Sequence, residues 1–304
     1  MQTRALRDIT MTPAISHFPV LLLALMLWGN AGTAQEPVRD IRYGADENQR
    51  LDLSVPDGEG FPTVIFIHGG GLTSGDKADE DYRDVCTPFP EAGIACANVN
   101  YRLAPVNAWP TQPEDVAAAV AWVHTHISAR GGDPQKLFLF GHSSGAMLVA
   151  LLGTDERYLD RHGLKPSDLR GVMPMGSIMW DDELQQALEK HGRDSVEEAF
   201  ARDPDSKMYE SLDMYLDQWA IRHVGAGQPP FLFLIAEGEQ EEPPVLKTNM
   251  KFVENARAVG NQADYRVLPG RTHRSAIRSL SKAGDPVFAI VRDFVSRLGG
   301  TDRK

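Results

Sequence analysis

Short apolar runs alternate with longer stretches of helical periodicity along most of the chain. The apolar runs lie at 63–68, 94–99, 137–140, 171–175, 231–236 and 265–268. Such unbroken hydrophobicity is typical of strands buried on both faces of a parallel sheet. The intervening helical patterns lie at 80–92, 113–130 and 288–298. Strands that alternate with helices predict an α/β fold, in which helices flank a mostly parallel central sheet. Two further segments, 38–43 and 51–55, are predicted as edge strands.

Residues 177–228 interrupt this alternation with several helical patterns. Twelve acidic and four basic residues lie between Asp181 and Asp217. Aromatic and methionine side chains are interspersed among them: Trp180, Met208, Tyr209, Met214, Tyr215 and Trp219. We interpret the segment as a small helical cap with an apolar inner face and an acidic outer face. The alternative is a packed helical excursion that does not touch substrate.

The segment 141–145 reads Gly-His-Ser-Ser-Gly and follows an apolar strand directly. A helix-like run, 146–152, begins immediately after it. At a sharp strand-to-helix turn, glycines accept backbone angles that a Cβ would forbid. The serine between them is exposed, and the first amides of the next helix point towards it. The pattern predicts Ser143 as a nucleophile, whereas the simpler interpretation is a tight turn with a surface serine.

A second motif, His68 followed by Gly69, Gly70 and Gly71, comes just past the strand 63–68. Glycines leave backbone N–H groups unobstructed, and such groups can stabilise a developing oxyanion. The alternatives are a flexible glycine loop or a phosphate cradle. No Lys-Ser/Thr pair follows with P-loop spacing, which argues against phosphate binding.

His273 lies in a loop after the strand 265–268, late in the chain, where the base of such a site would be expected. Ser143, the glycines and His273 each follow a strand. Active sites of parallel sheets form at the carboxyl ends of the strands, so these groups can converge there.

The motifs occur together, in order, at spacings that resemble those of a known family. The residues concerned are His68-Gly69-Gly70-Gly71, Ser74-Gly75-Asp76-Lys77, Tyr101-Arg102-Leu103-Ala104-Pro105, Asp115, Gly132-Asp133-Pro134, the turn at 141–145, Pro229-Pro230 and the loop with His273. From about residue 38 to residue 298, the chain resembles α/β hydrolases of the hormone-sensitive-lipase-like and kynurenine-formamidase-like esterase branch. The resemblance implies an oxyanion hole formed by the N–H groups of Gly70, Gly71 and Ser144. It also implies the α/β-hydrolase fold and carboxylic ester hydrolysis.

The carboxylate that would orient His273 has three candidates after the strand 231–236. Counting along the strand favours Glu239, and counting back from the following helix favours Glu241. Glu242 has a proline after it, as relatives of the family do. Strand lengths vary less than loop lengths, so Glu239 is the predicted acid of a Ser143–His273–Glu239 triad.

Residues 1–34 are predicted to be a secretory signal peptide. Arg4 and Arg7 precede an apolar core at 18–28, and small residues at 32–34 suggest cleavage after Ala34. The apolar core is shorter than the roughly 20 residues that a membrane span needs. The mature protein, 35–304, is therefore expected to be secreted or periplasmic, although an uncleaved anchor is the alternative.

Net charge and cysteine usage limit the partners. The net charge of −11 disfavours nucleic acid and anionic membrane surfaces as partners.

Cys86 and Cys96 are the only cysteines, and their predicted positions in a helix and a buried strand favour two free thiols over a disulfide. His124 and His126 point to different faces of a predicted helix and make a poor metal pair. We predict no metal or cofactor.

These features favour a secreted serine hydrolase that acts on small carboxylic esters. Aryl formamidases and carbohydrate acetyl or feruloyl esterases are alternatives within the same chemistry. A different class, a catalytically silent binding protein of this fold, would predict a broken triad or oxyanion loop, and both motifs are intact. The oligomeric state is not indicated by the sequence.

Overall fold

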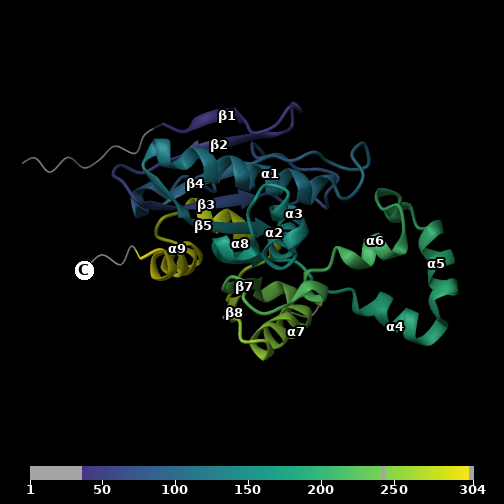
Figure 1. Cartoon of the computed structure of the whole chain (residues 1–304). Coiled ribbons are helices and arrows are strands. Elements are labelled where there is room, and N and C mark those ends of the chain that lie inside the picture. The colour runs from purple at the N-terminus through teal and green to yellow at the C-terminus, as the bar shows by residue number, and fades with distance from the viewer. Residues whose placement is uncertain (1–35, 241–243, 301–304) are drawn as a thin grey trace, which may run out of the picture. The chain divides into compact units, whose positions relative to one another are not determined.

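An eight-stranded sheet forms the centre of the protein in the computed structural model, which describes residues 36–240 and 244–300 (Figure 1). The strands are β1 (Val38–Arg42), β2 (Arg50–Ser54), β3 (Phe61–Ile67), β4 (Ala95–Val99), β5 (Gly132–His142), β6 (Leu169–Met175), β7 (Phe231–Ala236) and β8 (Ala263–Leu268). Their order in the sheet is β1-β2-β4-β3-β5-β6-β7-β8. β2 is antiparallel to β1 and to β4, and the other pairings are parallel. The predicted α/β fold is thereby confirmed.

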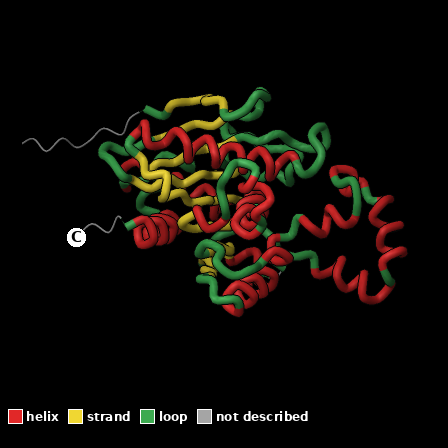
Figure 2. Tube along the Cα trace, in the orientation of Figure 1, coloured by secondary structure: helices red, strands yellow, loops and turns green. Residues whose placement is uncertain are grey.

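Helices fill most of the connections between strands (Figure 2). The α-helices are α1 (Thr111–His126), α2 (Ser144–Thr154), α3 (Glu156–Asp160), α4 (Asp182–His191), α5 (Arg193–Arg202), α6 (Leu212–Asp217), α7 (Val245–Ala258), α8 (His273–Arg278) and α9 (Pro286–Gly299). Short 3₁₀ helices lie at η1 (Pro90–Ala92), η2 (Ile127–Arg130), η3 (Pro166–Asp168), η4 (Pro204–Met208), η5 (Ala220–His223), η6 (Glu237–Glu239) and η7 (Ser279–Ser281). Among the helices that the structure describes, none combines the length and hydropathy that a bilayer span requires.

Alternate side chains of the central strands enter two separate hydrophobic cores. Ile65 and Ile67 of β3 pack with the helices α1, α2 and α7 on one face of the sheet. Val64 and Phe66 face the opposite side, where they pack with α8 and α9. Successive residues of a strand point to opposite faces, so a strand covered on both faces is apolar throughout. β3 is buried at every position, which explains its continuous hydrophobic sequence.

The first strands and the segment after residue 80 differ from the sequence predictions. β2 is not an edge strand, because it pairs with β4 as well as with β1. The predicted helix at 80–92 is wrong: turns occupy 80–89, and only η1 is helical. Pro88 and Pro90 lack the N–H groups that an α-helix would need there.

The prediction of two free thiols is also wrong. Cys86 and Cys96 form a disulfide, with Cα atoms 5.4 Å apart. Cys86 belongs to the turn segment instead of a helix, and this segment packs against the face of β4 on which Cys96 lies. The two sulfur atoms therefore meet across the same small core.

The segment predicted as a cap, 177–228, contains α4, α5, α6 and two 3₁₀ helices. α4, α5 and α6 follow one another as a separate group of helices (Figure 1). Val196, Leu212 and Leu216 form a small core of their own within this group. Met208 and Tyr209, between α5 and α6, pack against the main core, and the Met208 carbonyl accepts the backbone N–H of Trp109 at 2.8 Å. The predicted signal segment, residues 1–34, lies outside the described residues.

Candidate active site

Ser143 occupies the turn between β5 and α2 in a conformation that few residues adopt. Its φ is 56° and its ψ is −126°, and its backbone N–H donates to the Met175 carbonyl at 2.8 Å. The positive φ falls on the serine, and neither flanking glycine has one. A Cβ on Gly145 would lie 2.3 Å from the carbonyl oxygen of Ile67, and one on Gly141 would lie 2.2 Å from that of Gly145. The glycines are therefore required by close packing of the backbone, and the strain is concentrated at Ser143.

The glycine loop after β3 turns back on itself beside this serine. Gly70 and Gly71 have φ angles of 123° and 63°, which favour glycine. The Gly70 carbonyl accepts the N–H groups of Thr73 and Ser74 at 3.2 and 3.0 Å. A Cβ on Gly69 would lie 2.7 Å from the Cβ of Ser143, so the loop and the serine are in close contact.

Three backbone N–H groups are free to receive an acceptor at this place. Within the described part of the chain, no group accepts a hydrogen bond from the N–H of Gly70, Gly71 or Ser144. Ser144 is the first residue of α2, and the first N–H groups of a helix have no partner within it. The residues that the resemblance assigns to an oxyanion hole therefore carry available donors.

Side chains hold the glycine loop against α2. The Leu72 N–H donates to Ser144 Oγ at 3.3 Å. The Tyr101 hydroxyl donates to the His68 carbonyl at 3.1 Å, and its ring stacks on the buried His68 ring at 4.5 Å. Burial lowers the pKa of His68, so this histidine is neutral and acts as packing for the loop.

His273 and Glu239 form a hydrogen-bonded pair. His273 begins α8, and its Nδ1 contacts one carboxylate oxygen of Glu239. Glu239 ends η6, is 4% exposed, and accepts the backbone N–H of Ala236 at 2.8 Å with its other oxygen. Of the three acidic candidates, Glu239 is therefore in contact with the histidine. Glu241 and Glu242 lie outside the described residues.

Gly176 packs beneath this pair, and none of the sequence motifs includes it. Its φ is 66°, and a Cβ there would lie 2.8 Å from Oε1 of Glu239 and 3.0 Å from Nδ1 of His273. The only signal in the sequence is a glycine that directly follows the strand β6.

Ser143, the glycine loop, Glu239 and His273 follow β5, β3, β7 and β8, which run parallel in one sheet. All four groups thus lie at the carboxyl edge of the sheet, as predicted. The rings of His142 and His273 are 4.4 Å apart between centroids, which places His273 beside the serine turn. The arrangement brings a strained serine, a carboxylate-bound histidine and free N–H donors to one place.

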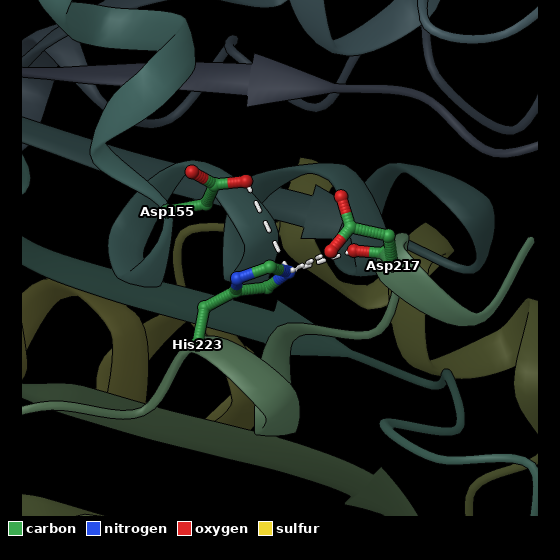
Figure 3. A group of neighbouring side chains, drawn as sticks. All are labelled: Asp155, Asp217 and His223. Atoms are coloured by element: carbon green, nitrogen blue, oxygen red, sulfur yellow. Dashed lines mark hydrogen bonds and ion pairs between the residues drawn. The ribbon is translucent and has the colours of Figure 1, made fainter. Parts of the chain in front are cut away.

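A second cluster of polar side chains lies elsewhere in the fold, at α3 and η5 (Figure 3). Asp155, Asp217 and His223 offer ligand atoms within 4.8 Å of one another. Arg157 pairs with both carboxylates, at 2.5 Å each, and these contacts raise the pKa of its guanidinium. His223 Nε2 lies 2.7 Å from the Asp217 carbonyl. Because Arg157 already occupies an oxygen of each carboxylate, the cluster is an ion-pair network that ties α6 and η5 to α3.

The order of the strands and the serine turn after β5 define the α/β-hydrolase fold. The chain belongs to the BD-FAE family, whose model matches residues 51–249. It is 30% identical over 276 residues to the probable carboxylic ester hydrolase LipM of Mycobacterium tuberculosis. This alignment covers 86% of this chain and 61% of LipM. It is 29% identical over 266 residues to the esterase LipC of the same organism, in an alignment that covers 83% of this chain and 63% of LipC. The chain thus spans about three fifths of the length of these two relatives.

Solved structures of similar fold include two described as esterases. A truncated form of a carbohydrate esterase from gut microbiota superposes with a TM-score of 0.70 and 17% identity, over 88% of this chain and 98% of the other. The esterase Est2 of Thermogutta terrifontis, with propionate bound, gives a TM-score of 0.67 and 21% identity, over 88% of this chain and 96% of the other. At such identities the comparison establishes the shared fold.

Proposed function

We propose that this protein is an exported serine hydrolase that cleaves small carboxylic esters. Ser143 is the nucleophile, His273 the general base and Glu239 the acid that orients it. The N–H groups of Gly70, Gly71 and Ser144 form the oxyanion hole. The observation that carries the proposal is the contact between His273 Nδ1 and the buried Glu239 carboxylate beside the strained Ser143 turn.

In the first half of the reaction, Ser143 Oγ attacks the ester carbonyl carbon while His273 Nε2 takes its proton. Glu239 is fixed by the Ala236 N–H, so it holds the Nδ1–H tautomer and stabilises the imidazolium that forms. The carbonyl oxygen becomes an oxyanion and accepts the free N–H groups. When the tetrahedral intermediate collapses, the ester C–O bond breaks, and the imidazolium gives its proton to the leaving alcohol.

In the second half, water replaces the alcohol and the histidine is used again. His273 takes a proton from the water, whose oxygen attacks the acyl carbon of the acyl-serine. The same N–H groups stabilise the second oxyanion. The bond from Ser143 Oγ to the acyl carbon then breaks, Oγ regains its proton from the imidazolium, and the carboxylic acid leaves.

Esters carried by carbohydrates are a second candidate substrate class. The similarity to a structure described as a carbohydrate esterase supports it, and the steps above apply to any leaving alcohol. Aryl formamides would be cleaved by the same steps, with an amine as the leaving group. A panel of nitrophenyl esters, acetylated or feruloylated sugars and aryl formamides separates these classes by kcat/KM.

Export is part of the proposal. The disulfide between Cys86 and Cys96 supports it, because disulfides persist in oxidising compartments and are rare in the cytosol. The pattern of Arg4, Arg7 and the apolar core points the same way. Recovery of the protein outside the cytosol with Gln35 as its first residue would support export, and an intact cytosolic chain would contradict it.

Covalent labelling tests the nucleophile directly. A fluorophosphonate should label the purified protein once, and Ser143→Ala should take up no label and hydrolyse esters several orders of magnitude more slowly. Ser167→Ala is the matched control, because Ser167 is an exposed serine. Labelling or turnover of Ser143→Ala at the unmodified protein's rate would refute the proposed function.

A further inference from the structure

His142, the residue before the serine, makes contacts that link it to His273. Its ring is buried, with Nε2 3.1 Å from the His273 carbonyl and Nδ1 3.1 Å from the Tyr82 hydroxyl. The planes of the His142 and His273 rings are inclined by 38°, at a centroid distance of 4.4 Å. His142 thus contacts both the backbone and the ring of His273.

The hydrogen bonds determine the tautomer of His142. A carbonyl oxygen can only accept, so Nε2 must carry the proton and donate it to the His273 carbonyl. The neutral ring then presents an unprotonated Nδ1, and the Tyr82 hydroxyl donates to it. Burial, and secondarily the nearby His273, lowers the pKa of His142 to about 3, which keeps the ring in this single neutral form.

Tyr82 also lies against the glycine loop. A Cβ built on Gly69 would lie 2.8 Å from its hydroxyl oxygen, and burial raises the pKa of Tyr82, so the hydroxyl stays protonated. A hydrogen-bonded path therefore runs from Tyr82 through His142 to the His273 carbonyl. It connects a residue in contact with the loop that carries the oxyanion donors to the residue that carries the base.

The side chain of His273 needs such support because it is 42% exposed. Packing alone does not fix a half-exposed ring, and Glu239 restrains it only at Nδ1. A second clamp lies one residue further on, where Asp81 pairs with Arg274 at 2.7 Å and also with Arg278. Asp81 is the neighbour of Tyr82, so one segment supports both His142 and Arg274, and the disulfide at Cys86 joins this segment to β4.

We propose that His142 is a positioning residue for the reaction. Together with Tyr82 it forms a hydrogen-bonded strut that holds the backbone and the ring plane of His273 at the correct place relative to Ser143. This inference rests on the proposed function, because it assigns His142 a role in the geometry of the same site. It requires no proton transfer through His142, whose protonation state does not change during the reaction.

Two substitutions of equal polarity but different reach test the strut. The amide nitrogen of Gln can take the place of histidine Nε2, whereas that of Asn lies one methylene short and matches Nδ1. His142→Asn should lower kcat by about tenfold to 100-fold with KM within about twofold, because a small displacement of the base acts on the chemical step. His142→Gln should recover most of that loss, to within about threefold of the unmodified enzyme. His162→Asn, at an exposed histidine, is the control for loss of an imidazole.

An NMR measurement makes the test independent of ester hydrolysis. The proton on His273 Nδ1, observed in ¹⁵N-histidine-labelled protein, should be protected from exchange in the unmodified protein and in His142→Gln. In His142→Asn it should broaden through exchange with water. Tyr82→Phe should act in the same direction, because it removes the hydrogen bond that holds the other side of the His142 ring at Nδ1, and it replaces His142→Asn where that variant does not fold.

The outcomes separate the two hypotheses. The predicted pattern of NMR protection in a protein that hydrolyses no member of the substrate panel would support the strut and refute the proposed function. Ester hydrolysis with kcat and Nδ1–H protection unchanged in His142→Asn would support the proposed function and refute the strut. Equal losses in the Gln and Asn variants would also refute it, since the role would then be one of packing.

Discussion

Glu239 binds His273 with one carboxylate oxygen and the backbone of its own strand with the other. The first oxygen contacts Nδ1 of the ring, and the second accepts the Ala236 N–H at 2.8 Å. Hydrogen bonds to both oxygens fix the rotation of the carboxylate, and its burial excludes water from competing for the ring. The short helix η6 after β7 brings the side chain back over the end of its strand.

Replacing Glu239 by glutamine should therefore remove the charge while keeping the shape. We expect Glu239→Gln to lower kcat about 10²- to 10⁴-fold, because the amide neither stabilises the imidazolium nor enforces the correct tautomer. Glu241→Gln is the matched control and should stay within about threefold of the unmodified enzyme, since Glu239 is the acid that the proposal assigns to His273. Steady-state kinetics on a nitrophenyl ester measure both. If Glu241→Gln loses kcat and Glu239→Gln keeps it, Glu241 is the acid, as counting back from the following helix would indicate.

The sequence could place Ser143, His273 and Glu239 at one site because each follows a recognisable strand. Parallel strands bring their carboxyl ends together, so the position of each residue after its strand was enough to predict that the three residues lie at the same edge of the sheet. The reason for the glycines around Ser143 could not be obtained in this way. Gly145 is required by the carbonyl of Ile67, whose approach depends on how α2 packs on β3.

Contacts between distant segments account for what the sequence did not reveal. Tyr82 and His273 lie 60 and 131 residues from His142, and no local pattern signals such partners. The same holds for the disulfide, since its formation depends on turns near Cys86, where the sequence pattern predicts a helix. Local periodicity thus predicts the strands, while tertiary packing determines how the residues between them support the site.

Gly176 offers a test of the packing under the His273–Glu239 pair. A Cβ there would lie 2.8 Å from Oε1 of Glu239, so Gly176→Ala should displace the pair and lower kcat about tenfold or more. Gly163→Ala is the matched control, because Gly163 has a φ of 71° and a Cβ there would meet nothing within 4 Å. Gly163→Ala should lose about 1–2 kcal/mol of unfolding free energy, the cost of a Cβ at positive φ, and Gly176→Ala should lose at least as much, because it also displaces the buried pair. Only Gly176→Ala should lose activity, and equal kcat values in both variants would contradict the close contact.

The buried His142 predicts a specific loss of stability in acid. Its pKa in the folded protein is lowered to about 3 by burial, whereas an unperturbed histidine titrates near 6.5. Between these pH values the unfolded chain binds a proton that the folded chain does not, so the free energy of unfolding falls as the pH falls. At pH 5 this contribution is about 2 kcal/mol lower than at neutral pH.

His142→Gln removes this titration, so urea unfolding should show a smaller decline between pH 7 and pH 5 than in the unmodified protein. His162→Gln, at an exposed position, should decline as the unmodified protein does. The buried His68 has a lowered pKa as well, but it is present in all three proteins and cancels in the comparison. Parallel pH profiles for His142→Gln and the unmodified protein would show that His142 is not held neutral by burial.

The length of the acyl chain should limit the rate of ester hydrolysis. The helical segment 177–228 contacts the body of the protein at Met208 and Tyr209, between α5 and α6, where both residues contact Trp109 in the loop that follows β4 at the carboxyl edge of the sheet. We expect these side chains to provide an apolar wall of limited extent beside the acyl group, because the segment has only about 50 residues. Each buried CH₂ contributes about 0.8 kcal/mol until the space is filled, so the best acyl groups should have about two to six carbons.

A series of nitrophenyl esters of increasing acyl length, each below its micelle threshold, measures this dependence through kcat/KM. We expect kcat/KM to rise over the first members, at most about fourfold per CH₂, and to fall once the acyl group exceeds the space available. Polyanionic esters should be poor substrates, because the segment from Asp181 to Asp217 carries twelve acidic and four basic residues and repels them. Raising the salt concentration should reduce the discrimination against anionic esters but leave the chain-length optimum in place, since screening acts on charge alone. A rate that keeps climbing to long acyl chains, or that jumps at an oil surface, would identify a lipase and refute the short-ester preference.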